Sequence, residues 1–89
     1  MTRWSASPRR AAAAKAMTDT FVSARAKLGL TQAQLAERAG LTIDEVAKLE
    51  AGVRQPVEKF VCLCIALGLK TSDVMRRILR AMDEAEPRT

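Results

Sequence analysis

The stretch that decides the fold is Thr31–Gly52, TQAQLAERAGLTIDEVAKLEAG, which contains the same helix-start signal twice. The first signal is Thr31 with Gln34, and the second is Thr42 with Glu45. In each, the threonine hydroxyl can accept a hydrogen bond from the backbone N–H of the later residue, whose side chain can return to the threonine N–H. Two such capping boxes in close succession predict two short helices, one beginning after Thr31 and the other after Thr42.

Apolar residues and a glycine frame these two short helices. Leu30 with Leu35, and Leu41 with Val46, are possible hydrophobic staples across the helix starts. Gly40 lies between the helices, where a left-handed turn favours a residue without a Cβ. Two short helices joined by a glycine turn form a helix-turn-helix. This motif mainly serves to place its second helix in the major groove of DNA.

The rest of the sequence predicts three further helices and no strands. Glycines at positions 29, 40, 52 and 68 mark the ends of helices in this 89-residue chain. The first helix ends at Leu28, and the others span Gln32–Ala39, Ile43–Ala51, Pro56–Leu67 and Ser72–Ala85. The first helix has two possible starts, because Ser7-Pro8 is a good opening pair and Thr18 could cap a shorter helix. The alanine-rich segment over residues 11–16 favours the longer helix.

The composition excludes several kinds of site. The chain has no His and no Tyr, and Cys62 and Cys64 are its only thiols. Helical residues two positions apart point in different directions, so a disulfide between these cysteines is not expected. A zinc site and a nucleophile–base pair both lack the required residues. We therefore expect a cytoplasmic protein that is not an enzyme and that has no metal, cofactor or membrane-spanning segment.

The net charge of +5 is concentrated near the N-terminus. Residues 1–30 contain six basic residues and one acidic residue, whereas residues 31–89 contain nine of each. A basic arm suits a phosphate backbone, although a solubilising tail would have the same composition. The sequence thus predicts a basic N-terminal extension over residues 1–16 that is partly helical and partly disordered. A helix-turn-helix domain over residues 17–85 and a C-terminal tail over residues 86–89 follow it.

The second helix of the motif has one face that could read bases. A rotation of 100° per residue places Ile43, Asp44, Ala47, Lys48 and Ala51 on a single arc, and the first four of these are the candidates for base reading. Lys48 could donate to guanine, Asp44 could accept from cytosine, and Ile43 could pack on a thymine methyl group. Candidate phosphate contacts are Gln32, Arg54, Gln55, Arg9 and Arg10. The alternative is that all of these are ordinary solvated positions.

In this region the sequence resembles the phage-repressor and Cro type of helix-turn-helix regulator, also called the XRE family. The resemblance covers roughly residues 21–75 and is carried by Arg25, LTQAQLAERAG (30–40), Val46, LEAG (49–52), Arg54, Pro56 and IALGL (65–69). It implies an all-α, five-helix domain that binds pseudo-palindromic double-stranded DNA as a homodimer. It also implies an internal ion pair between Arg25 and Glu50, and a Gln32 that contacts a phosphate and braces the reading helix.

Two features depart from the family pattern. Acidic residues stand at Asp44 and Glu45, near positions that should face DNA, where they would repel phosphates. In addition, Val57, Val61 and Ile65 form a second apolar stripe on a helix whose other side already supplies core residues. Such a stripe needs a cover, which the N-terminal extension, the last helix or a second subunit could supply. The expected dimer or partner surface comprises Val57, Val61, Ile65, Ile78 and Met82.

These inferences lead to three hypotheses about function. The first is a nucleoid-associated transcriptional regulator that represses by occupying its operator as a homodimer. The second is an antitoxin of the same fold, which binds DNA and also masks a toxin protein through the apolar stripe. The third is a protein-interaction module that has lost DNA binding, which the acidic residues near the reading face suggest.

Overall fold

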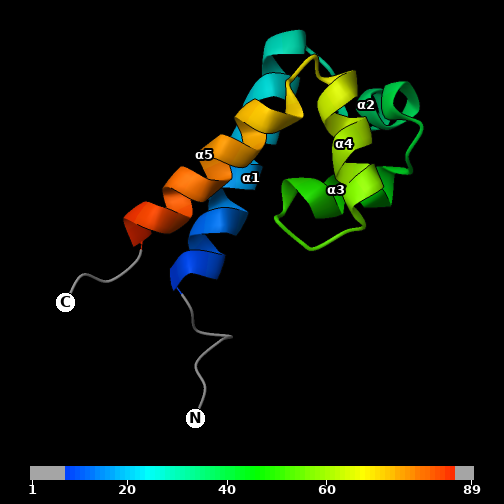
Figure 1. The fold of residues 1–89 in the computed structure, drawn as a ribbon. Coiled ribbons are helices and arrows are strands. Elements are labelled where there is room, and N and C mark those ends of the chain that lie inside the picture. The colour runs from blue at the N-terminus through cyan, green and yellow to red at the C-terminus, as the bar shows by residue number, and fades with distance from the viewer. Residues whose placement is uncertain (1–7, 86–89) are drawn as a thin grey trace, which may run out of the picture.

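The computed structural model describes residues 8–85, and every regular element in this range is a helix. The helices are α1 (Pro8–Leu28), α2 (Gln32–Ala39), α3 (Ile43–Glu50), α4 (Val57–Ala66) and α5 (Thr71–Ala85) (Figure 1). α1 and α5 lie side by side, and α2, α3 and α4 form a compact group beside them. The expected all-α fold with five helices is confirmed.

α1 is one continuous helix that begins at Pro8 rather than after Thr18. The boundary expected after residue 16 therefore falls inside a helix. Alanines at positions 11–14 and 16 favour helix, and Ala13 and Ala16 pack against the buried core, so this part of the chain belongs to the fold. The disorder expected at the start of the chain and the tail expected at residues 86–89 lie outside the described residues.

Both predicted capping boxes are present. Thr31 Oγ1 accepts a hydrogen bond from the Gln34 N–H at 3.1 Å, and Gln34 Oε1 accepts one from the Thr31 N–H at 2.9 Å. Thr42 and Glu45 form the same two bonds with the same lengths. Gly40 joins the helices with a φ of 72°, in the left-handed region where a Cβ is strained. Side chains next to the helix starts in sequence thus fix where α2 and α3 begin.

The core is formed by apolar side chains from all five helices. Its fully buried members are Phe21, Leu35, Val46, Leu49, Leu63, Cys64 and Val74. Phe21 of α1 meets Phe60 of α4 edge to face, with ring centroids 5.4 Å apart. Both cysteines are free, and burial raises the pKa of the Cys64 thiol.

The predicted partner surface is wrong for Ile78 and unsupported for Met82. Ile78 is only 7% exposed, and Met82 packs against the buried cluster. Their helical spacing from Val74 places both on the side of α5 that packs on α1. Val57 and Ile65 of the stripe, by contrast, are 72% and 70% exposed. α1 packs along α5 rather than along α4, so the N-terminal residues 8–16 leave the stripe uncovered.

A buried carboxylate joins three helices. Glu50 ends α3, and its side chain is 4% exposed. Its Oε2 accepts a hydrogen bond from Arg25 Nε of α1 at 2.6 Å, and its Oε1 accepts from Arg25 Nη2 at 3.1 Å. Gln32 Nε2, at the start of α2, donates to the same Oε1 at 2.9 Å. The ion pair implied by the resemblance is present in the fold, and Gln32 extends it to a third helix.

The N-terminal half of α1 also reaches the loop that follows α3. Gly52 in this loop has a φ of 77°, and a Cβ there would lie 2.6 Å from the Ala14 Cβ and 2.9 Å from the Ala14 backbone. A glycine facing a small residue permits this close approach. The contact holds the loop, which carries Arg54, against α1.

Glu50→Ala should lower the free energy of unfolding by on the order of 2–4 kcal/mol. The substitution leaves Arg25, whose side chain is 22% exposed, and the Gln32 amide without their acceptor. Urea unfolding measures the difference. Asp19→Ala is the matched control, since it removes the exposed Lys15–Asp19 pair on α1 and should change stability little. Equally small effects of both substitutions would contradict the role given to Glu50.

Gly52→Ala should destabilise the protein more than Gly40→Ala. The two glycines have similar left-handed φ values, so both substitutions carry a backbone strain of roughly 1–2 kcal/mol. Only at Gly52 would the new Cβ also meet another backbone, since nothing lies within 4 Å of a Cβ at Gly40. Urea unfolding of the two variants gives the comparison. Equal losses of stability would show that the contact with Ala14 does not constrain the loop.

Candidate nucleic-acid interface

α3 buries one side and leaves the other open to solvent. Val46 and Leu49 are fully buried, and their packing fixes the rotation of the helix about its axis. On the opposite side, Ile43, Asp44 and Lys48 are exposed and Ala47 is half-buried. These four residues, hereafter the α3 outer face, occupy the arc expected from the helical period.

Two residues of the α3 outer face pair with each other. Lys48 Nζ lies 3.1 Å from Asp44 Oδ2, one helical turn away. Both side chains are largely exposed, so the pair contributes little to stability and can exchange its partner for a base edge. The Asp44 carboxylate is therefore balanced by a cation on the same face, which reduces the repulsion of phosphate expected from the sequence.

Glu45 has partners away from the α3 outer face. Besides closing its capping box with Thr42, its Oε2 lies 2.5 Å from Lys59 Nζ of α4. The bond from Lys59, together with the bond from the Thr42 N–H, lowers the pKa of the Glu45 carboxyl. The stabilisation from these links is therefore fully present at pH values above the pKa that the Glu45 carboxyl has in the unfolded chain. It is lost as the pH falls through the lower pKa of the folded state. Sequence reasoning missed Lys59, because only the packing of α4 beside α3 brings it to Glu45.

The predicted phosphate contacts differ in their solvent exposure and in the hydrogen bonds that their side chains already make. Gln32 is the first residue of α2, next to backbone N–H groups of the first turn, but its side-chain amide already donates to Glu50. Gln55 is half-buried and folds back, with Nε2 donating to the Arg54 carbonyl at 3.0 Å. Arg54 is exposed, as are Arg9 and Arg10 in the first turn of α1. Arg10 and Arg54 are thus more open to phosphates than the side chains of the two glutamines.

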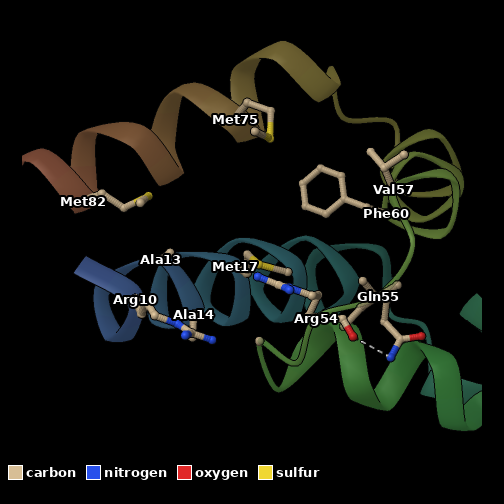
Figure 2. A pocket seen from close by; sticks show the side chains of 12 residues that line it. Arg10, Ala13, Ala14, Met17, Arg54, Gln55, Val57, Phe60, Met75 and Met82 are labelled. Carbon is tan, nitrogen blue, oxygen red and sulfur yellow. Dashed lines mark hydrogen bonds between the residues drawn. The ribbon is translucent and has the colours of Figure 1, made fainter. Parts of the chain in front are cut away.

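The fold brings Arg10 close to the loop after α3. Arg10 of α1 and Arg54 of the loop line the same cleft, in which both side chains lie over α1 (Figure 2). The contact between Ala14 and Gly52 places the two segments together. The sequence predicts an N-terminal extension that contains Arg10 and a separate loop that contains Arg54, with no contact between them. The one local sign of the contact is a small residue in each segment, Ala14 and Gly52.

The described residues provide neither a metal site nor a membrane span. Within residues 8–85, no group of three or more His, Cys, Asp and Glu side chains could hold a metal ion. In the same range, no helix combines the length and apolar character needed to cross a membrane.

A comparison with known protein families identifies the family to which this helix-turn-helix belongs. The family model described as Helix-turn-helix matches residues 23–74, which include α2, α3 and α4 entire, the end of α1 and the start of α5. No curated protein and no solved structure matched the chain. The match covers more than half of the chain and contains both capping boxes, Glu50 and the α3 outer face. The chain therefore belongs to the phage-repressor and Cro type, or XRE family, of helix-turn-helix DNA-binding transcription regulators.

Proposed function

We propose that this regulator is a sequence-specific repressor that occupies its operator as a homodimer. The observation that carries the proposal is the α3 outer face, which is open to solvent on a helix held by two buried side chains, a capping box and Glu50. A helix held in this way can enter the major groove with little loss of conformational freedom. Repression by occupancy needs only such a DNA-binding surface.

The α3 outer face supplies a set of base contacts. Lys48 donates to guanine O6 and N7, and Asp44 accepts from cytosine N4. Ile43 packs on a thymine methyl group, and the small side chain of Ala47 allows the helix to approach the bases closely. The Asp44–Lys48 pair opens when the base edges take its place, at small cost because both groups are exposed.

Phosphate contacts fix the register of this helix on DNA. Arg54, directly after α3, and Arg9 and Arg10, on the neighbouring first turn of α1, supply positive charge. The backbone N–H groups at the start of α2 supply a further contact beside Gln32. The charge of Arg9 and Arg10 thereby acts through a helix that is part of the fold.

The apolar stripe of Val57, Val61 and Ile65 is the proposed dimer surface. Val57 and Ile65 are exposed on α4 and Val61 between them is half-buried. In a symmetric dimer the same stripe of each subunit would cover the other. The same exposure supports the second candidate function, an antitoxin that covers the stripe with a toxin protein. The third hypothesis loses its motive, because Lys48 and Lys59 balance the two acids on which it rested.

Binding-site selection tests the proposed base contacts. Lys48→Ala and Asp44→Ala should each change the preferred bases, since one good base contact gives about 1–3 kcal/mol of discrimination. Arg54→Gln should keep the consensus and lower the affinity for all DNA sequences. It should also flatten the slope of log K against log salt by about 0.9. Arg38→Gln on α2 is the control for the loss of one positive charge and should preserve the affinity and the salt slope of the wild type. A wild-type consensus from the Lys48 and Asp44 variants would refute base reading by these residues.

Light scattering tests the proposed dimer. The wild type should be a dimer on DNA, with half-sites about one helical turn, roughly 34–36 Å, apart. Ile65→Lys should give a monomer, because it places two like charges in the symmetric interface. Leu79→Lys changes a comparably exposed residue of α5 and should leave the dimer intact. A wild type that is monomeric both free and on DNA would contradict the dimer and favour the antitoxin function.

A further inference from the structure

An open cleft of about 390 Å³ lies between α1, α5 and the segment that joins α3 to α4 (Figure 2). Its volume falls within the range of about 300–1,000 Å³ that is typical of small-molecule sites. None of the four residues of the α3 outer face lines it. The cleft is therefore a surface that base reading does not use.

The walls of the cleft are apolar and adaptable. Met17 of α1 and Met75 and Met82 of α5 line it, together with Phe60 of α4. The chain has four methionines, and the fourth is Met1. Thioether side chains are flexible and polarisable, so they adapt to apolar ligands of irregular shape. Such walls suit a flexible hydrocarbon chain.

Cationic groups accompany these apolar walls. Arg10 and Arg54 line the same cleft, and their side chains extend toward each other in the view of Figure 2. No acidic residue lines the cleft, and no carboxylate of residues 8–85 pairs with either guanidinium. The site thus combines apolar walls with positive charge that has no counterion within the described part of the chain.

We propose that this cleft binds a small linear carboxylate, with the carboxylate between Arg10 and Arg54 and the hydrocarbon chain over the methionines. Guanidinium groups match the planar geometry of a carboxylate. A DNA phosphate would satisfy the arginines but leave the methionine walls uncovered. A second copy of this chain would bring its own Arg10 and Arg54 to the interface, where the like charges would oppose association.

The methionine methyl groups report binding directly. The full chain, labelled with ¹³C at the methionine methyls, is titrated with acetate, hexanoate, octanoate and decanoate below their micellar concentrations. The resonances of Met17, Met75 and Met82, which line the cleft, should shift. The Kd should fall about two- to fourfold for each added methylene and reach about 1 mM or below for decanoate, while acetate should give no saturating shift.

Matched variants separate the two parts of the site. The double variant Arg10→Gln and Arg54→Gln should bind decanoate at least tenfold more weakly and should keep its affinity for decanol. Arg38→Gln should change neither affinity. Met75→Gln, inside the cleft, should lower the affinities for decanoate and for decanol severalfold. Leu79→Gln, at an exposed position on the same helix but outside the cleft, is its control and should have no effect.

Three results would overturn the proposal. The first is the absence of methyl shifts with any of the longer acids. The second is an affinity that does not depend on chain length, which would indicate a simple anion site. The third is a set of methyl shifts that depend on protein concentration without ligand and that persist in Ile65→Lys, which would indicate that a second copy fills the cleft independently of the proposed α4 dimer.

A consequence for DNA binding rests on the proposed function. Because Arg54 is also a proposed phosphate contact, decanoate should weaken DNA binding of the wild type more than that of Met75→Gln, as measured by fluorescence anisotropy. The methyl titration uses no DNA, so a failure of ligand binding and a failure of DNA binding are distinguished. Saturable ligand binding with no effect on DNA would confine the proposal to the ligand site and contradict this consequence.

Discussion

The Glu50 carboxylate is the group on which the relative positions of α1, α2 and α3 depend. A carboxylate that is almost fully buried is costly unless a partner compensates its charge. Here Arg25 of α1 donates two hydrogen bonds to it and Gln32 of α2 donates a third. The geometry of these bonds allows little variation, because the fork of a guanidinium matches a carboxylate in few orientations. The end of α3 is thereby tied to the two helices that precede it.

The functional surface follows from this constraint. Glu50 and the buried side chains of α3 fix which side of the helix turns inward, and this leaves the α3 outer face to solvent. The capping box at Thr42 fixes where the helix begins. After α3, the chain passes at once to Gly52, whose contact with Ala14 brings the following loop and Arg54 against α1. The α3 outer face and Arg54, the proposed reading and phosphate contacts, therefore share one support.

Features set by neighbouring residues could be predicted from the sequence. The two capping boxes, the glycine turn and the exposed arc of α3 depend on spacings of a few residues, and the structure contains all of them. The five helices follow for the same reason. The pair of Arg25 and Glu50 is a contact between distant positions, and it was accessible only through the resemblance to a known family.

Contacts that depend on packing could not be predicted. The sequence pattern predicts a partner surface at Ile78, because an apolar helical stripe looks the same whether it packs on its own core or on another subunit. Lys59 gave no sign of its link to Glu45, since nothing local relates the two helices. The same holds for the approach of Ala14 to Gly52, and with it for the placement of Arg10 and Arg54 on one cleft. These contacts are decided by how helices stack, which spacing within one helix does not specify.

We propose that the surface fixed by Glu50 is the one that meets DNA. Amide chemical shifts of the ¹⁵N-labelled protein, followed during titration with a duplex that carries its selected operator, test this claim most directly. The largest shifts should fall on Ile43–Lys48, on the first turn of α2 and on Arg54. Shifts confined to α4 and α5, with α3 unchanged, would contradict it.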